Sequence, residues 1–180
     1  MKYLIASDIH GSAFYCAQLL EALHREGADT LLLLGDLLYH GPRNDLPQGY
    51  APKEVAAMLN GVQQRVFCVR GNCEAEVDQL MLRFPVLGDY CLLEAAGKLV
   101  FATHGHQYNL QTPPALKPGD VLLHGHTHVP AKDSSAGFWY LNPGSVSIPK
   151  EGSAHGYMTL EGDAFRWKDL SGREYDSLTL

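Results

Sequence analysis

Five short apolar runs in this chain each end in a small group of Asp, Asn or His residues with a glycine beside them. Such polar groups are costly to bury unless something binds them, so their repeated placement constrains the fold strongly. In open α/β sheets, binding sites gather just beyond the carboxyl ends of the strands. The pattern therefore predicts strands whose ends meet at one polar site. The five groups are Asp8-Ile9-His10-Gly11, Gly35-Asp36, Gly71-Asn72-Cys73, His104-Gly105-His106 and His124-Gly125-His126-Thr127-His128.

The spacing of apolar residues predicts alternating strands and helices in the first half of the chain. Strands are expected at 2–7, 30–34 and 65–69, with helices over 14–25 and 52–59 between them. Such βαβ alternation favours parallel strands. After residue 83 helical periodicity almost disappears, and strands are expected near 90–94, 98–103, 120–124, 138–141, 157–160 and 164–170. We therefore predict an α/β protein with two packed sheets and helices outside them.

The length and composition suit one domain. A chain of 180 residues, 46% hydrophobic and 19% charged, is long enough to bury one substantial core. No repeat or low-complexity tract divides it, and the proline-rich segment 110–118 is typical of a surface loop. We predict a single domain over residues 1–180, with a weakly ordered tail at 171–180.

Charge, hydropathy and cysteine usage limit the compartment and the partners. The formal net charge of −6 argues against an extended nucleic-acid surface, although bound metal ions would reverse the sign locally. The N-terminal apolar run is too short for a signal peptide, and no segment reaches the roughly 20 apolar residues of a membrane span. The four cysteines lack paired spacing, so a cytoplasmic protein without a disulfide framework is expected. A homodimer or a higher homo-oligomer stays open.

Two of the polar groups have the spacing of metal ligands. Asp8 and His10 are two residues apart, as are His126 and His128, and alternation along an extended segment would place each pair on one side. A single Asp-x-His often arises by chance, and Gly-Asp or Gly-Asn is often only a turn. Two imidazoles at spacing two behind an apolar strand are more specific, because burying them is costly without a ligand. The five groups together favour metal binding.

The order Asp-x-His, Gly-Asp, Gly-Asn, His and Gly-His-x-His resembles the calcineurin-like metallophosphoesterase superfamily. The resemblance extends from residue 2 to about residue 150. Segments 40–44, 71–73 and 142–145 are similar to the small bacterial YfcE-type phosphodiesterases. This resemblance implies a four-layer αββα sandwich, with two mixed sheets flanked by helices, which agrees with the two sheets expected from the strand pattern.

The resemblance also implies two divalent transition-metal ions per chain. Mixed oxygen and imidazole ligands suit Mn, Fe, Co, Ni or Zn better than Ca, and we expect Mn. Asp36 is expected to bridge the ions with one carboxylate oxygen on each, and Asp36, Asn72 and His104 are expected to act in catalysis. The other expected ligands are Asp8, His10 and His128 for the first ion, and Asn72, His104 and His126 for the second.

The expected function is that of a phosphodiesterase acting on a small phosphodiester. Two ions about 4 Å apart can share an attacking hydroxide and neutralise charge on the phosphoryl oxygens. The alternatives are a non-catalytic metal-binding scaffold on the same fold, or a phosphomonoesterase or nuclease of the same superfamily. A structural zinc domain is disfavoured, because such sites are usually rich in cysteine and closed.

Cys73 departs from the pattern of the superfamily. Many members have a histidine at this position, which is thought to protonate the leaving oxygen. A thiol is a poorer general acid, with a reference pKa near 8.5 against about 6.5 for imidazole. We therefore expect a preference for good leaving groups, as in aryl phosphates or activated diesters. Arg43, Cys73 and His106 are the candidate substrate-binding residues, although a supporting or exposed position for His106 stays open.

Overall fold

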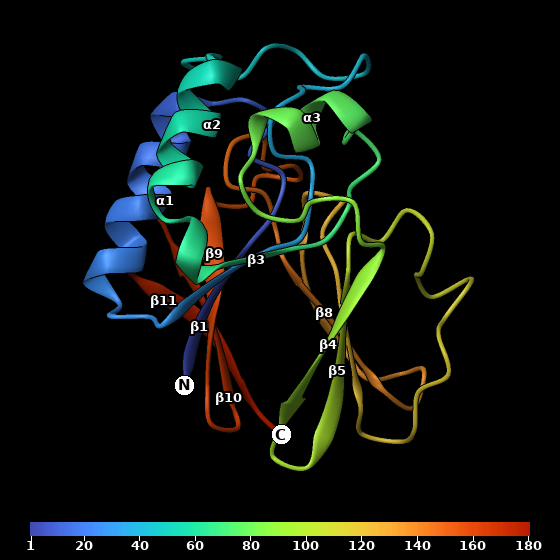
Figure 1. Ribbon diagram of the computed structural model, residues 1–180. Coiled ribbons are helices and arrows are strands. Elements are labelled where there is room, and N and C mark those ends of the chain that lie inside the picture. The colour runs from blue at the N-terminus through green and yellow to red at the C-terminus, as the bar shows by residue number, and fades with distance from the viewer.

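The computed structural model describes all 180 residues and contains two β-sheets and three α-helices (Figure 1). The helices are α1 (Ala13–Arg25), α2 (Pro52–Gly61) and α3 (Glu76–Met81), with a short 3₁₀ turn, η1 (Gln63–Arg65), after α2. The six-stranded sheet has the order β11 (Glu174–Thr179), β10 (Ala164–Asp169), β9 (Gly156–Glu161), β1 (Lys2–Ala6), β2 (Thr30–Leu33) and β3 (Val66–Cys68). The five-stranded sheet has the order β4 (Tyr90–Ala95), β5 (Lys98–Thr103), β6 (Val121–Leu123), β8 (Trp139–Pro143) and β7 (Pro130–Asp133).

Both sheets mix parallel and antiparallel pairs, which confirms the predicted α/β class with two mixed sheets. In the six-stranded sheet β1, β2 and β3 are parallel, whereas β9 pairs antiparallel with β1. In the other sheet β5, β6 and β8 are parallel, and β4 and β7 are antiparallel partners at its two edges. Figure 1 shows α1 and α2 on the outer side of the six-stranded sheet, with the second sheet on its other side. No helix follows α3, as the loss of helical periodicity after residue 83 predicts.

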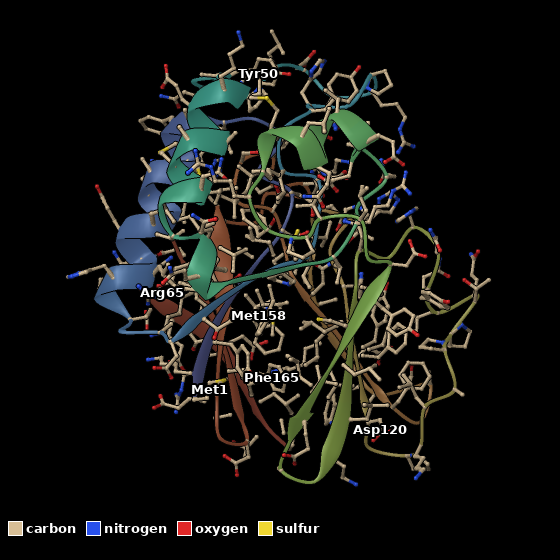
Figure 2. All side chains as sticks on the ribbon, in the orientation of Figure 1. Met1, Tyr50, Arg65, Asp120, Met158 and Phe165 are labelled. Carbon is tan, nitrogen blue, oxygen red and sulfur yellow. The ribbon has the colours of Figure 1, made fainter.

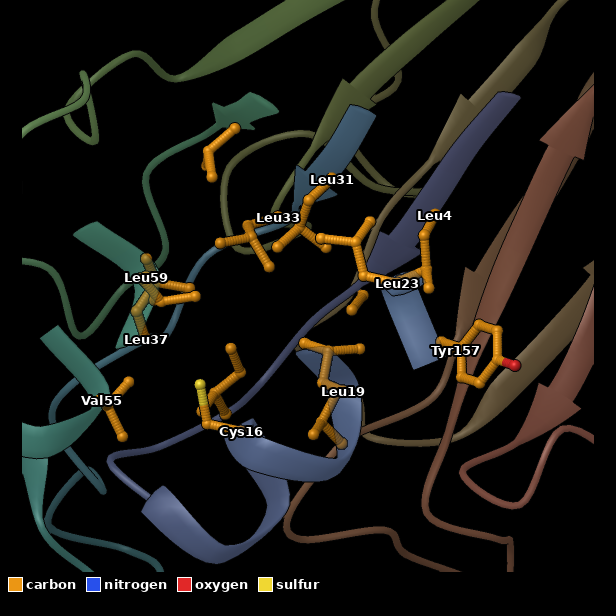
Figure 3. Close-up of a cluster of buried hydrophobic side chains, with 14 of the residues drawn as sticks. Leu4, Cys16, Leu19, Leu23, Leu31, Leu33, Leu37, Val55, Leu59 and Tyr157 are labelled. Atoms are coloured by element: carbon orange, nitrogen blue, oxygen red, sulfur yellow. The ribbon is translucent and has the colours of Figure 1, made fainter. Parts of the chain in front are cut away.

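The apolar strands are buried on both faces because their side chains alternate between two cores. Leu4 and Leu31 point into a core shared with α1 and α2 (Figure 3). Ile5 and Leu32, one position further along each strand, point into the core between the two sheets. Burial on both faces explains why β1 and β2 are continuous apolar runs. Each fully buried leucine or isoleucine contributes about 1.5–3 kcal/mol, so these strands hold their loops firmly in place.

The core between the sheets is continued by the late strands. Met158 of β9 and Phe165 of β10, both labelled in Figure 2, are fully buried there. Trp167 of β10 is buried beside them, and its indole N–H donates a hydrogen bond of 2.7 Å to the carbonyl oxygen of Asn142 in β8. This bond joins the two sheets close to the loops that follow β8.

The end of the chain corrects one expectation. Residues 174–179 form β11, an edge strand paired antiparallel with β10 from Ala164 opposite Thr179 onward, and so a weakly ordered tail at 171–180 is wrong. Leu178 packs against the core between the sheets, and Lys132 of β7 forms an ion pair with Asp176. The sequence does not predict this strand because most of its side chains are exposed and polar.

None of the three helices is long and apolar enough to cross a membrane.

Candidate metal centre

The expected ligands all lie in loops that follow strands of the two sheets. Asp8 and His10 follow β1, Asp36 follows β2, and Asn72 follows β3. His104 comes directly after β5, and the His126–His128 loop follows β6. The loops of the six-stranded sheet meet those of the five-stranded sheet through a hydrogen bond of 3.0 Å, in which the backbone N–H of His126 donates to Asp8 Oδ2. The predicted convergence of distant strand ends is therefore present in the structure.

A first group contains Asp8, His10 and His128. The Nε2 atoms of His10 and His128 are 3.2 Å apart, and Asp8 Oδ1 lies 3.5 Å from the first and 3.3 Å from the second. All three side chains are buried, and Asp8 Oδ1 has no hydrogen-bond partner. Three donor atoms thus face one point, and one of them is a buried acceptor that a cation would satisfy.

A second group contains Asn72, His104 and His126. Asn72 Oδ1 lies 3.0 Å from His104 Nε2, and His126 Nδ1 lies 3.2 Å from the same nitrogen. An amide oxygen and two imidazole nitrogens therefore converge beside the first group. Both groups contain the residues that the superfamily resemblance implies.

Asp36 lies between the two groups, but with one oxygen instead of two. Asp36 Oδ2 is 3.7 Å from His10 Nε2 and 3.5 Å from His104 Nε2. The other oxygen, Oδ1, accepts a hydrogen bond of 2.9 Å from the backbone N–H of Cys73. The geometry offers Oδ2 to both groups, while the backbone of Cys73 holds the carboxylate in this orientation, and one oxygen for each ion stays a prediction.

Backbone carbonyl groups fix three of the imidazoles. The Nδ1 atoms lie 2.8 Å from Tyr39 O for His10, 2.7 Å from Leu34 O for His104 and 2.7 Å from Ile148 O for His128. A carbonyl oxygen only accepts, so each Nδ1 carries a proton, and whenever such a ring is neutral its Nε2 is the unprotonated nitrogen. This arrangement orients an imidazole for metal binding and raises its basicity.

Five of the seven residues have left-handed backbone conformations. Non-glycine residues in this region cost of order 1–3 kcal/mol each and persist only where the surrounding structure imposes them. Asp8 and His10 therefore do not face each other through extended alternation, as we expected from their spacing; the loop turns sharply at each residue. The φ angles are 60° for Asp8, 49° for His10, 57° for Asp36, 67° for His126 and 62° for His128.

The electrostatics of the cluster are those of a site that attracts cations. Burial raises the pKa of Asp8, but the close imidazoles of His10 and His128 more than offset it and hold that pKa well below its usual range. Burial lowers the pKa of His104, whereas the contact with Asp36 raises it, with a net rise to about 9. Burial and the neighbouring His104 lower the pKa of His126 to about 4. The metal-free cluster therefore holds ionised carboxylates and retains a proton on His104 at neutral pH.

Glu74, which the sequence does not single out, holds together the backbone of two loops that carry expected ligands. Its buried carboxylate accepts hydrogen bonds from the backbone N–H groups of Asp36 at 2.9 Å, Leu37 at 2.7 Å and Gly71 at 2.5 Å. Burial, with the charge of Asp36, raises the pKa of Glu74 to about 7 despite these bonds. Only glycine fits at position 71, because a Cβ there would lie 2.5 Å from the backbone nitrogen of Asp36. The loop that carries Asp36 is thus held by the loop that carries Asn72.

A polar cavity of about 390 Å³ opens onto the cluster, and only one of its twelve lining residues is hydrophobic. Arg43 and Cys73 line it, as the sequence analysis expected of substrate-binding residues. His106 does not line it; its half-buried ring lies 5.4 Å from that of His104. Lys150 also lines the cavity and is a second cation at the rim that the sequence did not single out.

The chain belongs to the calcineurin-like phosphoesterase superfamily, whose domain matches residues 1–164. It is 47% identical over 163 residues to the phosphodiesterase YfcE of Escherichia coli, covering 91% of this chain and 89% of that protein. The solved structure of YfcE, described as a phosphoesterase, aligns with a TM-score of 0.95 and 42% identity over 99% of both chains.

More distant relatives share the same fold. The chain is 28% identical to the probable metallophosphoesterase YsnB of Bacillus subtilis, over 99% of this chain and 96% of that protein. The structure of Vacuolar Protein Sorting 29 from Cryptosporidium parvum aligns with a TM-score of 0.63 at 19% identity, covering 99% and 98% of the two chains, which shows the fold alone.

The protein is therefore an enzyme of the metallophosphoesterase class, and the family and the α/β fold with two mixed sheets are confirmed. Membership implies divalent metal ions, and the residues present fit them. The unpartnered Asp8 Oδ1 and the three Nε2 atoms freed by Nδ1 contacts are the donors that such ions require.

Proposed function

We propose that the protein is a dinuclear phosphodiesterase that hydrolyses a small phosphodiester. The position of Asp36 Oδ2, between the two donor groups, is the observation that carries the proposal. A single oxygen shared by two groups of ligands suits a pair of adjacent cations better than one isolated ion. When bound, the ions would lower the pKa of a shared water and neutralise charge that develops on the phosphoryl oxygens.

The residues of the chain divide into three roles in this proposal. Asp8, His10 and His128 hold one ion, Asn72, His104 and His126 hold the other, and Asp36 joins the two groups. Asp36, Asn72 and His104 are the catalytic residues in this proposal: Asp36 contacts both groups, and His104 lies next to Asp36 and Asn72. Asn72 adds an oxygen ligand without negative charge, which leaves the centre more attractive to a phosphate. Arg43 and Lys150 supply positive charge at the rim, where a phosphate oxygen would enter.

The metal, the compartment and the assembly are proposals of the same kind. Oxygen and imidazole donors favour a transition metal, and we propose Mn, with Fe, Co, Ni or Zn as the alternatives. The four cysteines form no disulfide, which agrees with a reducing, cytoplasmic compartment. A homodimer or a higher homo-oligomer is compatible with the exposed apolar side chains, such as Leu92, which is 54% exposed on the edge strand β4.

The Mn-loaded protein is expected to hydrolyse bis(4-nitrophenyl) phosphate and to prefer good leaving groups. Burial, reinforced by the charge of Asp36, raises the pKa of the Cys73 thiol, so Cys73 stays protonated and protonates a leaving oxygen poorly. The kcat/KM value for the aryl diester should exceed that for alkyl phosphomonoesters by about a hundredfold or more, because general acid catalysis normally supplies about 10²–10⁴ in rate. The measurement is a rate series across aryl and alkyl esters of graded leaving-group pKa.

Two results would count against this proposal in different ways. A metal-loaded protein that is inert toward every ester would favour a non-catalytic scaffold. A rate that does not change with leaving-group pKa would leave the phosphodiesterase intact but remove the preference argued from Cys73.

Manganese affinity is expected to rise with pH between about 6 and 9. His104 has a pKa of about 9 in the metal-free protein, so at pH 7 it carries a proton that must leave before Nε2 can bind a cation. The affinity of the protein for Mn²⁺ therefore falls as the pH decreases below the pKa of His104, by up to about tenfold per pH unit for one proton. His126, with a pKa lowered to about 4, releases none in this range.

Titration calorimetry in buffers of different ionisation enthalpy measures how many protons are released when Mn²⁺ binds. At pH 7 we expect release of at least one proton per chain on Mn²⁺ binding. Binding without proton release, or affinity that is constant from pH 6 to 9, would contradict the assignment of His104.

A further inference from the structure

A second cavity adjoins the metal cavity and differs from it in polarity. It has a volume of about 370 Å³, and seven of its ten lining residues are hydrophobic, against one of twelve around the metal cavity. Cys73 lines both cavities, so the two meet at that residue. The apolar groove, as we name the second cavity, is formed mainly by Leu38, Tyr39, Tyr50, Val77 and Met81.

The walls of the apolar groove are fixed relative to the metal ligands. Tyr39, on one wall, accepts the hydrogen bond from His10 Nδ1 through its carbonyl oxygen at 2.8 Å. Tyr50, labelled in Figure 2 beside the start of α2, packs tightly against Gly11, where a Cβ would lie 2.5 Å from its ring. Cys73 is held by its hydrogen bond to Asp36 Oδ1. A group bound in the groove would therefore have a defined position relative to the centre.

Several side chains of the apolar groove are exposed to solvent. Tyr39 is 43% exposed, Met81 42% and Val77 59%, although all three are apolar or aromatic. Exposed apolar groups gathered in one concave place mark a binding surface more often than isolated ones do. Leu80, on the same helix α3, is 85% exposed but lies outside the groove.

We propose that the apolar groove binds an aromatic group of the phosphodiester substrate while its phosphate lies at the metal centre. The proposal rests on the phosphodiesterase function and narrows its substrate class to diesters with at least one aromatic substituent. Proximity identifies the occupant: the two cavities share Cys73 as a lining residue, so a group attached to a phosphate at the metal centre lies next to the groove. Two tyrosines among the lining residues offer ring faces and edges, which favour an aromatic group over a charged one.

Phosphonate inhibitors test the groove without any chemical step. Benzylphosphonate and methylphosphonate carry the same metal-binding head and differ in the aromatic ring. With the Mn-loaded protein and bis(4-nitrophenyl) phosphate as substrate, we expect benzylphosphonate to inhibit with a Ki about tenfold lower than methylphosphonate, as burial of part of one ring implies. Val77→Asn should reduce this ratio to about two, because it places an amide in the groove.

Leu80→Asn is the matched control, since it makes the same kind of change on α3 outside the groove, and it should keep the tenfold ratio. Val77 and Leu80 are both exposed, so neither variant threatens folding. Equal Ki values for the two phosphonates in the wild-type protein would overturn the proposal. The proposal would also be overturned if Val77→Asn kept the ratio but dissociated an oligomer, because the groove would then bind a second copy of the chain. Absent hydrolysis of bis(4-nitrophenyl) phosphate by the Mn-loaded protein would instead reject the phosphodiesterase function itself.

Discussion

Replacement of either His126 or His128 by alanine is expected to lower kcat/KM for bis(4-nitrophenyl) phosphate by about a thousandfold or more, because in the proposed dinuclear centre both ions would act on one phosphate. The two residues are neighbours in one loop but belong to different groups. His128 Nε2 lies 3.3 Å from Asp8 Oδ1, whereas His126 Nδ1 lies 3.2 Å from His104 Nε2. Each variant should therefore lose a different ion, and the metal content should fall from two equivalents to one.

The double variant separates a shared centre from two independent sites. If the ions act as a unit, His126→Ala and His128→Ala together should cost little more activity than either alone. His24→Ala, an exposed histidine on α1, is the control and should keep full activity and both ions. Two equivalents of metal in either single variant, or activity close to wild type, would show that the ligands are assigned wrongly.

The sequence predicts which residues meet, because each expected ligand lies in a loop that follows an apolar strand. The parallel pairing of β1 with β2 and of β5 with β6 then brings the carboxyl ends of these strands to the same edge of each sheet. The reason that we gave for the Asp8 and His10 pair was nevertheless wrong. Both residues have positive φ angles, 60° and 49°, so a tight turn and not an extended segment directs their side chains. Such conformations are imposed by the surrounding contacts, which periodicity does not record.

The orientation of the Asp36 carboxylate lies beyond what the sequence can show. It depends on the backbone N–H of Cys73, which occupies Oδ1 and leaves Oδ2 between the two groups. The same holds for α3 and β11, whose apolar residues are few and mostly exposed. Val77 and Leu80 of α3 face solvent, and β11 is an edge strand, so neither element has the amphipathic pattern that predicts burial.

Glu74→Ala is expected to lower the free energy of unfolding by about 3 kcal/mol or more, because three buried backbone donors lose their common acceptor. Read from the sequence, Glu74 is an ordinary acidic residue next to Cys73. In the structure it is 4% exposed and binds the amides of Asp36, Leu37 and Gly71, so it ties the loop after β2 to the loop after β3. Urea denaturation of the metal-free protein measures the loss without a contribution from bound ions.

The same substitution should also weaken metal binding, since the backbone that carries Asp36 loses its support. Glu76→Ala is the matched control two residues further on: Glu76 is exposed in the first turn of α3 and has only a small favourable interaction with the helix dipole. That variant should change the free energy of unfolding by less than about 1 kcal/mol. Equal destabilisation by the two substitutions, or a Glu74→Ala protein that binds two ions with unchanged affinity, would mean that the Asp36 loop is held by other contacts.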